Sequence, residues 1–438
     1  MYYIVESDEQ LRKLDERGYK NCYVNVVWNN DATHEKLATP LLIYYRPLEG
    51  KKSYFLCVNH TETMSIDVVK IKEFLNKHES IYVQNKKSFT YFMQHKNVLD
   101  VNFIKILKNN HQLELPTENA IFNIFSHKRL YDVNKIIPIS KHYERENNNW
   151  EVIKKYVNNP VIHTEEYKFY NETFTNVFKH IESNGIKLNK EIFDKHFNVL
   201  DERNSIKNNF IYTKYNLYTT TSRPSNAFNG VNFTALNKTD GSREAFVTSQ
   251  DTLLEFDYDG YHIRLIGDLV GYEFNDDSVH TQLGKVYFNK ETLDEEEYTE
   301  SKKKTFQIIY GGNHNQMPDS EFFHKYKTLT KSILYNTPKN CKRFSKKITE
   351  GFTPFKMLNY YIQSYETYNN VVVLDKLINY LSTKKSKIIA YNYDAFLIDF
   401  NAKDGKKFIT EVQTILKNGK FPTKVSFSEN YNTLVKIN

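Results

Sequence analysis

The segment TLLEFDYDGYHIRLIGDL (252–269) has the pattern of a strand that ends in acids and passes directly into a helix. A later segment, KIIAYNYDAFLIDF (387–400), consists of two apolar runs around a short polar centre, which predicts a β-hairpin. Asp257 then lies where a buried strand meets a helix, and Asp394 lies at the tip of the hairpin. If the strand and the hairpin are adjacent in one sheet, both carboxylates point into one site.

Two neighbouring aspartates repel each other unless cations lie between them. Carboxylate oxygens are hard ligands that suit Mg²⁺, which keeps water and substrate phosphates in its coordination shell. Two such ions can assist phosphoryl transfer by activating an attacking hydroxyl and stabilising the leaving group. The pair therefore indicates a magnesium site, although either residue alone also fits an ordinary surface acid at a turn.

A third segment, EEEYTESKKKTFQIIYGG (295–312), predicts a helix that ends at glycines. Lys302, Phe306 and Tyr310 follow one another at i, i+4 and i+8, so they lie along one face. A cation and two aromatic rings on one stripe suit a nucleotide, because base–aromatic stacking contributes about 1–3 kcal/mol. The alternative is a half-buried amphipathic helix with a lysine that reaches solvent.

Length and composition set broad limits on the class of protein. The chain has 438 residues, 40% of them hydrophobic, which is enough for two or three domains with proper cores. A net charge of +7 is compatible with a polyanionic partner without demonstrating one. The sequence has three scattered cysteines, no signal-like N-terminus and no long apolar run. We therefore expect a cytoplasmic protein with no membrane segment.

The ordered set of motifs resembles family A DNA polymerases. FDYDGYHIRLIGDL is similar to motif A, KKKTFQIIYGG to motif B and YNYDAFLIDF to motif C. Further segments resemble other conserved parts of the family in the same order: NVFKHIESNGIKLN, YTTTSRPSN, NGVNF, SREAFV, SVHT and LNYYIQS. The resemblance covers residues 172–400 and implies a template-directed DNA polymerase that adds dNTPs to a primer 3′ end.

The resemblance also implies the fold and its division. The expected class is α/β multidomain, with an α+β palm in a right-hand polymerase of palm, fingers and reduced thumb, preceded by an RNase H-like exonuclease-type domain. The exonuclease-like domain is expected at 1–145 and the polymerase domain at 146–438. Its expected parts are connecting helices and thumb (146–210), palm with motif A (211–262), fingers with motif B (263–340) and palm with motif C (341–438). The polar stretch 142–150 is expected to be a linker, and the thumb one helix over 189–206.

Site roles carry over from the family where residues match. Two Mg²⁺ ions are expected on Asp257, Asp394 and the carbonyl of Tyr258. The residues expected to bind the nucleotide are Tyr258, His262, His280, Lys302, Phe306 and Tyr310. The residues expected to hold primer–template DNA are Arg223, Asn232, Asn359 and Gln363. Contacts of that kind position DNA without reading its sequence.

Several positions depart from the family pattern. The motif B arginine falls at Tyr298, the second acid of motif C is Ala395, and the motif A glutamate is His262. The last change leaves the selection of deoxy- over ribonucleotides open. In the N-terminal part, Asn25, Val27 and Phe89 stand where an exonuclease has acids. Metal-dependent hydrolysis needs carboxylates, so no proofreading is expected.

The partners and the alternatives follow from the same comparison. A short thumb grips less duplex, which predicts low processivity or a replisome partner that supplies the grip, for an enzyme that is otherwise a monomer. The compact, divergent chain is expected in a phage or another mobile element, and then in the host cytoplasm. Two other readings stay open: a single-subunit RNA polymerase-like enzyme, and a catalytically inactive relative that binds nucleic acid or a replication partner.

Overall fold

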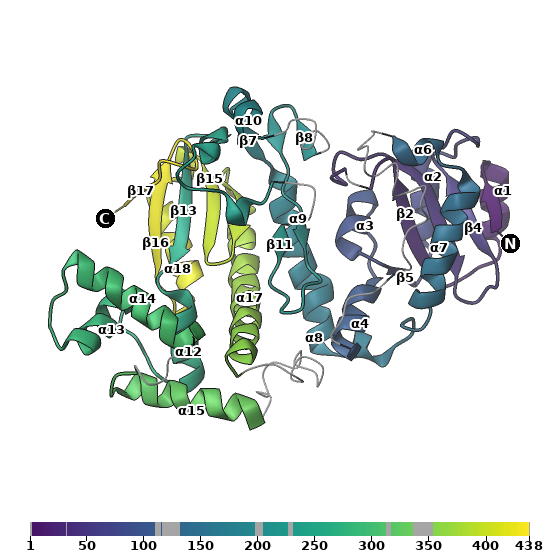
Figure 1. Ribbon diagram of the computed structural model, residues 1–438. Helices are drawn as coiled ribbons and strands as arrows, with labels where there is room; N and C mark the ends of the chain where they lie inside the picture. The colour runs from purple at the N-terminus through teal and green to yellow at the C-terminus, as the bar shows by residue number, and fades with distance from the viewer. Residues whose placement is uncertain are drawn as a thin grey trace. The chain divides into compact units, whose positions relative to one another are not determined.

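The computed structural model describes residues 2–31, 33–109, 115, 132–197, 205–226, 231–311, 317–335 and 354–437. The chain forms two compact units (Figure 1). Unit 1 comprises residues 1–218 and 226–232, and unit 2 comprises residues 219–225 and 233–438. Each unit has its own sheet, and each is described by itself.

The sheet of unit 1 has six strands in the order β1-β4-β3-β2-β5-β6. Its strands are β1 (Tyr2–Val5), β2 (Asn21–Trp28), β3 (Pro40–Pro47), β4 (Ser53–Cys57), β5 (Ser80–Val83) and β6 (Val98–Asp100). β3 is antiparallel to β2 and β4, whereas β1–β4, β2–β5 and β5–β6 are parallel pairs. Two apolar runs of this region, CYVNVVW and LLIYYRP, lie in β2 and β3.

Helices cover the sheet of unit 1. Its first four helices are α1 (Asp8–Asp15), α2 (Val68–Asn76), α3 (Lys86–Phe92) and α4 (Val101–Asn109). The helical spacing of Ile71, Phe74 and Leu75 places them on one face of α2, and all three are buried in one core cluster with sheet residues such as Val24 and Ile43. The burial of these apolar side chains is the main stabilising contribution to the unit.

The stretch 142–150 is not a linker, and that prediction is wrong. It lies inside helix α7 (Ile139–Ile153), which also crosses the expected domain boundary at 145/146. His142, Glu146 and Asn149 are buried at helical spacing, and the Trp150 ring lies 5.5 Å from that of Tyr23 on β2. The buried face of α7 is largely polar and hydrogen-bonded, so hydrophobic periodicity does not detect it.

The rest of unit 1 consists of short elements. They are α6 (Val133–Ile136), η1 (Pro160–His163), α8 (Glu165–Lys168), the π-helix η2 (Phe169–Phe174), α9 (Thr175–Asn184), β7 (Ile186–Leu188), α10 (Lys190–His196), β8 (Ile206–Lys207), β9 (Phe210–Ile211), β10 (Tyr215–Asn216) and β11 (Ser225–Asn226). Helix α9 ends at Gly185, which has a positive φ of 69° that glycine adopts readily.

The single helix expected over 189–206 is shorter than predicted. Helix α10 ends at His196, because Phe197 leaves the helical conformation with φ −124° and ψ 146°. Its ring stacks on Phe193 at 4.7 Å. Residues 198–204 lie outside the described chain, and Ile206 already belongs to strand β8.

The main sheet of unit 2 has five strands in the order β14-β15-β13-β16-β17, all antiparallel. They are β13 (Thr252–Tyr258), β14 (Lys387–Asn392), β15 (Ala395–Phe400), β16 (Thr423–Ser428) and β17 (Val435–Lys436). The strand and the hairpin predicted from the sequence are thus confirmed, and they are neighbours in one sheet. A short strand, β12 (Phe246–Val247), precedes them.

The helices of unit 2 are α12 (Tyr261–Val270), α13 (Val279–Phe288), α14 (Glu295–Gly311), α15 (Glu321–Tyr335), α17 (Pro354–Leu381) and α18 (Phe408–Lys417), with short turns η4 (Phe233–Ala235), η5 (Ser242–Ala245) and η7 (Ala402–Asp404). Helix α17 contacts α12, α14, α15 and α18 (Figure 1). Gly260 turns the chain from β13 into α12 at a φ of 52°, where a Cβ atom would lie 3.1 Å from Val279. In the described residues, no helix is long and apolar enough to cross a membrane.

Candidate active site

The sheet of unit 2 brings Asp257 and Asp394 to one place. Asp257 on β13 is paired in register with Ala395, the first residue of β15, so Asp394 is its diagonal neighbour. The backbone N–H of Tyr258 donates to the carbonyl oxygen of Asp394 at 2.9 Å. Both aspartate side chains are exposed, whereas Phe256 and Tyr258 beside Asp257 are buried. The expected arrangement of the two acids on adjacent strands is therefore confirmed.

A buried amide on helix α17 fixes the backbone around both acids. The Asn370 Oδ1 accepts a hydrogen bond from the Tyr261 hydroxyl at 2.8 Å, and Tyr261 begins the helix after Asp257. The Asn370 Nδ2 donates to the Tyr391 hydroxyl at 3.1 Å and to the Tyr393 carbonyl at 2.8 Å, directly before Asp394. Asn370 is fully buried, so these contacts are protected from water. Sequence reasoning missed this residue.

The hairpin tip is held in a strained conformation. Tyr393 has a left-handed φ of 63°, which costs a non-glycine residue about 1–2 kcal/mol. The Arg223 guanidinium lies 3.6 Å from the centre of the Tyr393 ring, and this cation–π contact offsets part of that cost. The tip that presents Asp394 is thus fixed from two sides, by Arg223 and by Asn370.

The electrostatics at the two acids favour a bound cation. Each carboxylate reaches solvent on one side and is desolvated by the protein around it. This desolvation, followed by the charges of Asp394 and Glu255, raises the pKa of Asp257 to about 7. Desolvation, followed by the charge of Glu366, also raises the pKa of Asp394. In the described part of the chain, neither carboxylate forms an ion pair. Glu255 was missed, although it lies two residues before Asp257 and so on the same face of β13.

A pocket of about 230 Å³ lies over the two acids and contains the predicted stripe of α14. Its lining includes all the residues predicted to bind metal or nucleotide, drawn from β13, the hairpin tip, α12, α13 and α14: Asp257, Tyr258, His262, His280, Lys302, Phe306, Tyr310 and Asp394, together with Arg223. The rings of Phe306 and Tyr310 are stacked, with centroids 5.7 Å apart and an interplanar angle of 17°.

Two positions that depart from the family motifs, Tyr298 and His262, also line this pocket. Tyr298 lines it, and its hydroxyl lies 3.2 Å from the Ser278 hydroxyl. Lys304 instead pairs with Glu300 at 2.9 Å and lies 4.8 Å from the Phe288 ring centre. The cation missing at Tyr298 is therefore not supplied by Lys304, as its helical angle predicts.

Two histidines of the pocket have different surroundings. Burial, followed by the charge of Lys302, lowers the pKa of His280 to about 4, so His280 is neutral near pH 7. The His280 Nδ1 is buried without a hydrogen-bond partner in the described chain. His262 is hydrogen-bonded through Nδ1 to the Tyr310 hydroxyl, and its Nε2 lies 3.4 Å from Glu366.

Glu366 on α17 is a fully buried acid that sequence reasoning also missed. Its Oε2 lies 2.9 Å from the Nε of Arg223, and its Oε1 accepts a hydrogen bond from the second nitrogen of the same guanidinium at 3.4 Å. The carboxylate therefore holds both Arg223 and His262. Its only sequence signal is position, since it lies three residues after Gln363 and shares that side of α17.

The residues predicted to contact DNA are only partly brought together. Gln363 accepts a hydrogen bond from the Thr221 hydroxyl at 3.1 Å, and Asn359 lies one turn earlier on the same helix. Arg223 and Thr221 belong to the short segment 219–225 of unit 2. Asn232 is exposed and belongs to unit 1, so it is not placed relative to the other three.

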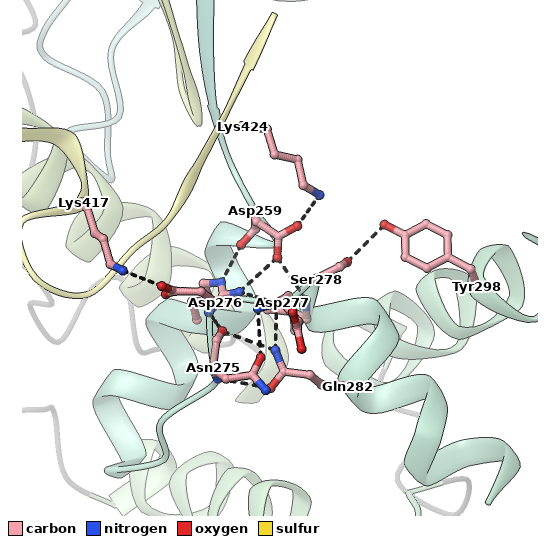
Figure 2. A network of polar contacts seen from close by, with 11 residues as sticks. Asp259, Asn275, Asp276, Asp277, Ser278, Gln282, Tyr298, Lys417 and Lys424 are labelled. Atoms are coloured by element: carbon pink, nitrogen blue, oxygen red, sulfur yellow. Dashed lines mark hydrogen bonds and ion pairs between the residues drawn. The ribbon is translucent and has the colours of Figure 1, made fainter. Parts of the chain in front are cut away.

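A network around Asp259 braces the pocket edge (Figure 2). The Asp259 Oδ2 accepts hydrogen bonds from Arg264 at 3.1 Å and from the Val279 N–H at 3.0 Å, and Oδ1 contacts the Lys424 ammonium. Burial alone would raise the pKa of Asp259, but these hydrogen bonds and the charge of Lys424 outweigh burial and lower it. Arg264 also donates to the carbonyl of Asp277 at 2.7 Å, which ties the start of α13 to α12.

Unit 1 has a pocket of its own, of about 290 Å³, where the exonuclease-like site was expected. Asn25 and Phe89 line it, and Val27 is buried beside it. Its acids are paired internally. Arg145 contacts Asp31 at 3.0 Å and Glu146 at 3.1 Å, and the Asn25 amide donates to Glu146 at 2.8 Å.

The remaining acid of that pocket, Glu35, pairs with Lys214 at 3.0 Å. Burial would raise the pKa of Glu35, but Lys214 and the neighbouring cations lower it to about 2. Across the described residues, no group of three or more histidine, cysteine, aspartate or glutamate side chains has an arrangement that holds a metal ion.

The chain has the mixed α/β fold of a polymerase domain. A solved structure with this fold is the POL domain of Pol1 from M. smegmatis, in complex with DNA primer-template and dNTP. The TM-score is 0.69 with 12% sequence identity, and the match covers 99% of each chain. No protein-family model matches the chain, and no curated protein matches its sequence. The predicted fold class is thus confirmed.

Proposed function

We propose that this protein is a template-directed DNA polymerase that adds dNTPs to a primer 3′ end. The observation that carries the proposal is the pocket of unit 2. It gathers two carboxylates that form no ion pair among the described residues, a lysine and two stacked aromatic rings, from three segments spread between residues 257 and 394. The fold shared with the Pol1 POL domain supports the same conclusion.

Asp257, Asp394 and the carbonyl of Tyr258 would hold two Mg²⁺ ions. The donor set fits, because the raised pKa values of both acids reflect negative charge that a cation relieves. Few protein ligands suit Mg²⁺, which takes the rest of its shell from water and substrate phosphates. When bound, Mg²⁺ would activate the primer hydroxyl and neutralise charge on the phosphates.

The other residues of the pocket position the nucleotide. Lys302 binds its phosphates, Phe306 stacks on its base and sugar, and Tyr310 is oriented by its hydrogen bond with His262. The primer 3′ hydroxyl gives its proton to water as its oxygen forms a bond to the α-phosphorus, the bond from that phosphorus to the bridging oxygen breaks, and pyrophosphate leaves. Catalysis of this kind consists mainly of positioning and electrostatic stabilisation.

Arg223, Asn359 and Gln363 would contact the primer–template beside this pocket. Helix α17 presents the two amides one turn apart, and Thr221 and Glu366 orient Gln363 and Arg223. Amides and guanidinium groups suit the acceptors that every base pair offers in the minor groove. The role of Asn232 stays a prediction, as do a monomeric state, low processivity or a replisome partner, and a phage setting in a host cytoplasm.

We further propose that unit 1 does not proofread. The acids of its pocket are already paired with Arg145 and Lys214, and an amide, Asn25, contacts the buried Glu146. Carboxylates that are neutralised in this way do not leave a pair for hydrolytic metal ions. Incubation with a 3′-mismatched primer and Mg²⁺, without dNTPs, is expected to leave the primer at full length.

The test of polymerase function is extension of a labelled primer–template with Mg²⁺, with dNTPs and rNTPs in parallel and Asp394→Asn as control. Growth with dNTPs that is lost in the variant supports the proposal. Growth with rNTPs only would instead make it an RNA polymerase-like enzyme. Duplex binding without growth in either mixture would make it an inactive relative, the reading that Ala395 favours.

A further inference from the structure

The pocket of unit 2 contains a lysine that no motif pointed to. Three basic side chains with a permanent positive charge line it, counting only described residues: Arg223, Lys302 and Lys424. Arg223 is committed to Glu366 at 2.9 Å and to the Tyr393 ring. Lys302 has no ion pair in the described chain. The cations available to bind the phosphates of a nucleotide are therefore Lys302 and Lys424.

Lys424 lies directly beside the proposed metal ligands. It is on β16, paired in register with Asp257, and cross-strand partners project from the same face of a sheet. On its other side Asp257 is paired with Ala395, which carries no charge. Asp257 thus has an uncharged residue, Ala395, on one neighbouring strand and a cation, Lys424, on the other. Lys302 lines the pocket from a different element, helix α14.

Asp259, the present partner of Lys424, does not need this lysine to stay neutralised. Lys424 contacts only Oδ1 of Asp259, while Oδ2 accepts hydrogen bonds from Arg264 at 3.1 Å and from the Val279 N–H at 3.0 Å (Figure 2). The Lys424 side chain is 45% exposed, and that of Asp259 is 3% exposed. If Lys424 turned away, Asp259 would still be neutralised by Arg264. A lysine suits such an exchange, because it is a point charge on a flexible stem.

We propose that Lys424 is a second phosphate-binding residue of this pocket. It leaves Asp259 when a nucleotide enters and binds the β- and γ-phosphates, with Lys302 on the other wall. When the bond from the primer oxygen to the α-phosphorus forms and the α–β bridge breaks, both lysines hold the departing pyrophosphate. This inference rests on the proposed polymerase function for its reaction, but the binding of polyphosphate is a property of the pocket alone.

The test compares Lys424→Met and Lys424→Arg with the native chain. Lys417→Met is the matched control, because Lys417 pairs with Asp276 at 2.7 Å and does not line this pocket. Steady-state extension gives the KM for dNTP, kcat and the inhibition constant for pyrophosphate. Calorimetric titration with sodium tripolyphosphate, without divalent metal, measures phosphate binding apart from activity.

Lys424→Met is expected to raise the KM and the pyrophosphate inhibition constant about tenfold, and to weaken tripolyphosphate to the same degree, with kcat nearly unchanged. Lys424→Arg should keep most of the affinity, and Lys417→Met should match the native chain. Unchanged tripolyphosphate binding in Lys424→Met would overturn the proposal. So would a lower kcat with unchanged affinity, which would mean that the lysine acts only on Asp257.

The two proposals fail in different ways. If the native chain does not extend primers but Lys424→Met and Lys302→Met both weaken tripolyphosphate binding, the polymerase function fails and the phosphate site stands. If the native chain extends primers and Lys424→Met binds both dNTP and pyrophosphate normally, the polymerase function stands and the role of Lys424 fails. Should Lys424→Met unfold, the tripolyphosphate affinity of Lys424→Arg decides, and a complete loss of affinity there would contradict the proposal.

Discussion

In the pocket of unit 2, Asp257 and Asp394 stand exposed and without an ion pair among the described residues, whereas in the pocket of unit 1 the acids Asp31, Glu35 and Glu146 each contact a cation. The first arrangement costs stability, because like charges face each other. The second satisfies its charges within the protein. Acids that lack a counter-charge favour the binding of a cation. The two units therefore differ in how the acids of their pockets are neutralised.

The largest expected effect comes from removing the unsatisfied charge. Asp257→Asn should slow primer extension about 10³-fold, since the charge stabilisation it supplies through bound cations is worth several kcal/mol. In EDTA the same variant should melt at the same temperature as the native chain or higher, because the repulsion from Asp394 is relieved. Single-turnover extension and a thermal melt measure the two effects.

Asp276→Asn is the matched control for that experiment, since Asp276 is an exposed acid paired with Lys417 outside the pocket. It should extend primers at the native rate. A fall in melting temperature that accompanies the loss of activity in Asp257→Asn would contradict the contrast, because Asp257 would then be a structural acid.

The opposite result is expected in unit 1, where a cation holds buried acids. Arg145→Met removes the partner of the fully buried Glu146 and should lower the free energy of unfolding by about 3 kcal/mol. Urea unfolding followed by tryptophan fluorescence reports on this unit alone, because the chain has only Trp28 and Trp150.

Lys154→Met at the end of the same helix breaks an exposed pair with Glu151 and should cost at most about 0.5 kcal/mol. Similar losses in the two variants would mean that Arg145 does not stabilise the pocket acids.

The smallest expected effect is on the pH dependence of the stability of unit 1, and it comes from buried histidines. Burial, followed by the charge of Arg145, lowers the pKa of His142 to about 3, and burial lowers that of His34 to about 4. An unfolded histidine titrates near 6.5, so below that pH the unfolded chain binds more protons than the native one. These histidines therefore make unit 1 less stable as the pH falls from about 6.5 to 4.

Asp100 has the opposite effect on stability. Burial raises its pKa to about 6, so this residue makes unit 1 more stable as the pH falls. A variant of His142 separates the effect of this histidine from that of Asp100. His142→Gln should lose about 2 kcal/mol less than the native chain between pH 6.5 and pH 4.5. The measurement is urea unfolding at the two pH values with the same tryptophan signal, and parallel losses in both proteins would exclude His142 as a cause.

Much of the site in unit 2 was predictable from the sequence because it depends on local pattern. The ends of strands placed Asp257 and Asp394, and helical spacing placed Lys302, Phe306 and Tyr310 on one face. The strand and the hairpin also lie in one sheet, which is the condition under which both acids reach one site.

The residues that sequence reasoning missed act through tertiary contacts. Asn370 and Glu366 lie in the middle of a long helix and are buried only because α17 packs against the site. Lys424 faces Asp257 through strand pairing that no spacing reveals. Helix α7 was missed for a related reason: its buried face is polar, and the hydrogen bonds that make burial favourable are formed with distant residues such as Asn25.

The chain passes between the two units at residues 218/219, 225/226 and 232/233, so unit 2 is not a continuous stretch. This has a practical consequence for expression fragments and for limited proteolysis. A fragment that begins at Phe233 keeps both aspartates and Lys302 but loses Arg223, and the buried Glu366 then faces only His262. An inactive or insoluble fragment of that kind would reflect the loss of the whole segment 219–225, which also contacts Gln363 and Ser364 through Thr221, and of unit 1. It would say nothing about the activity of the intact chain.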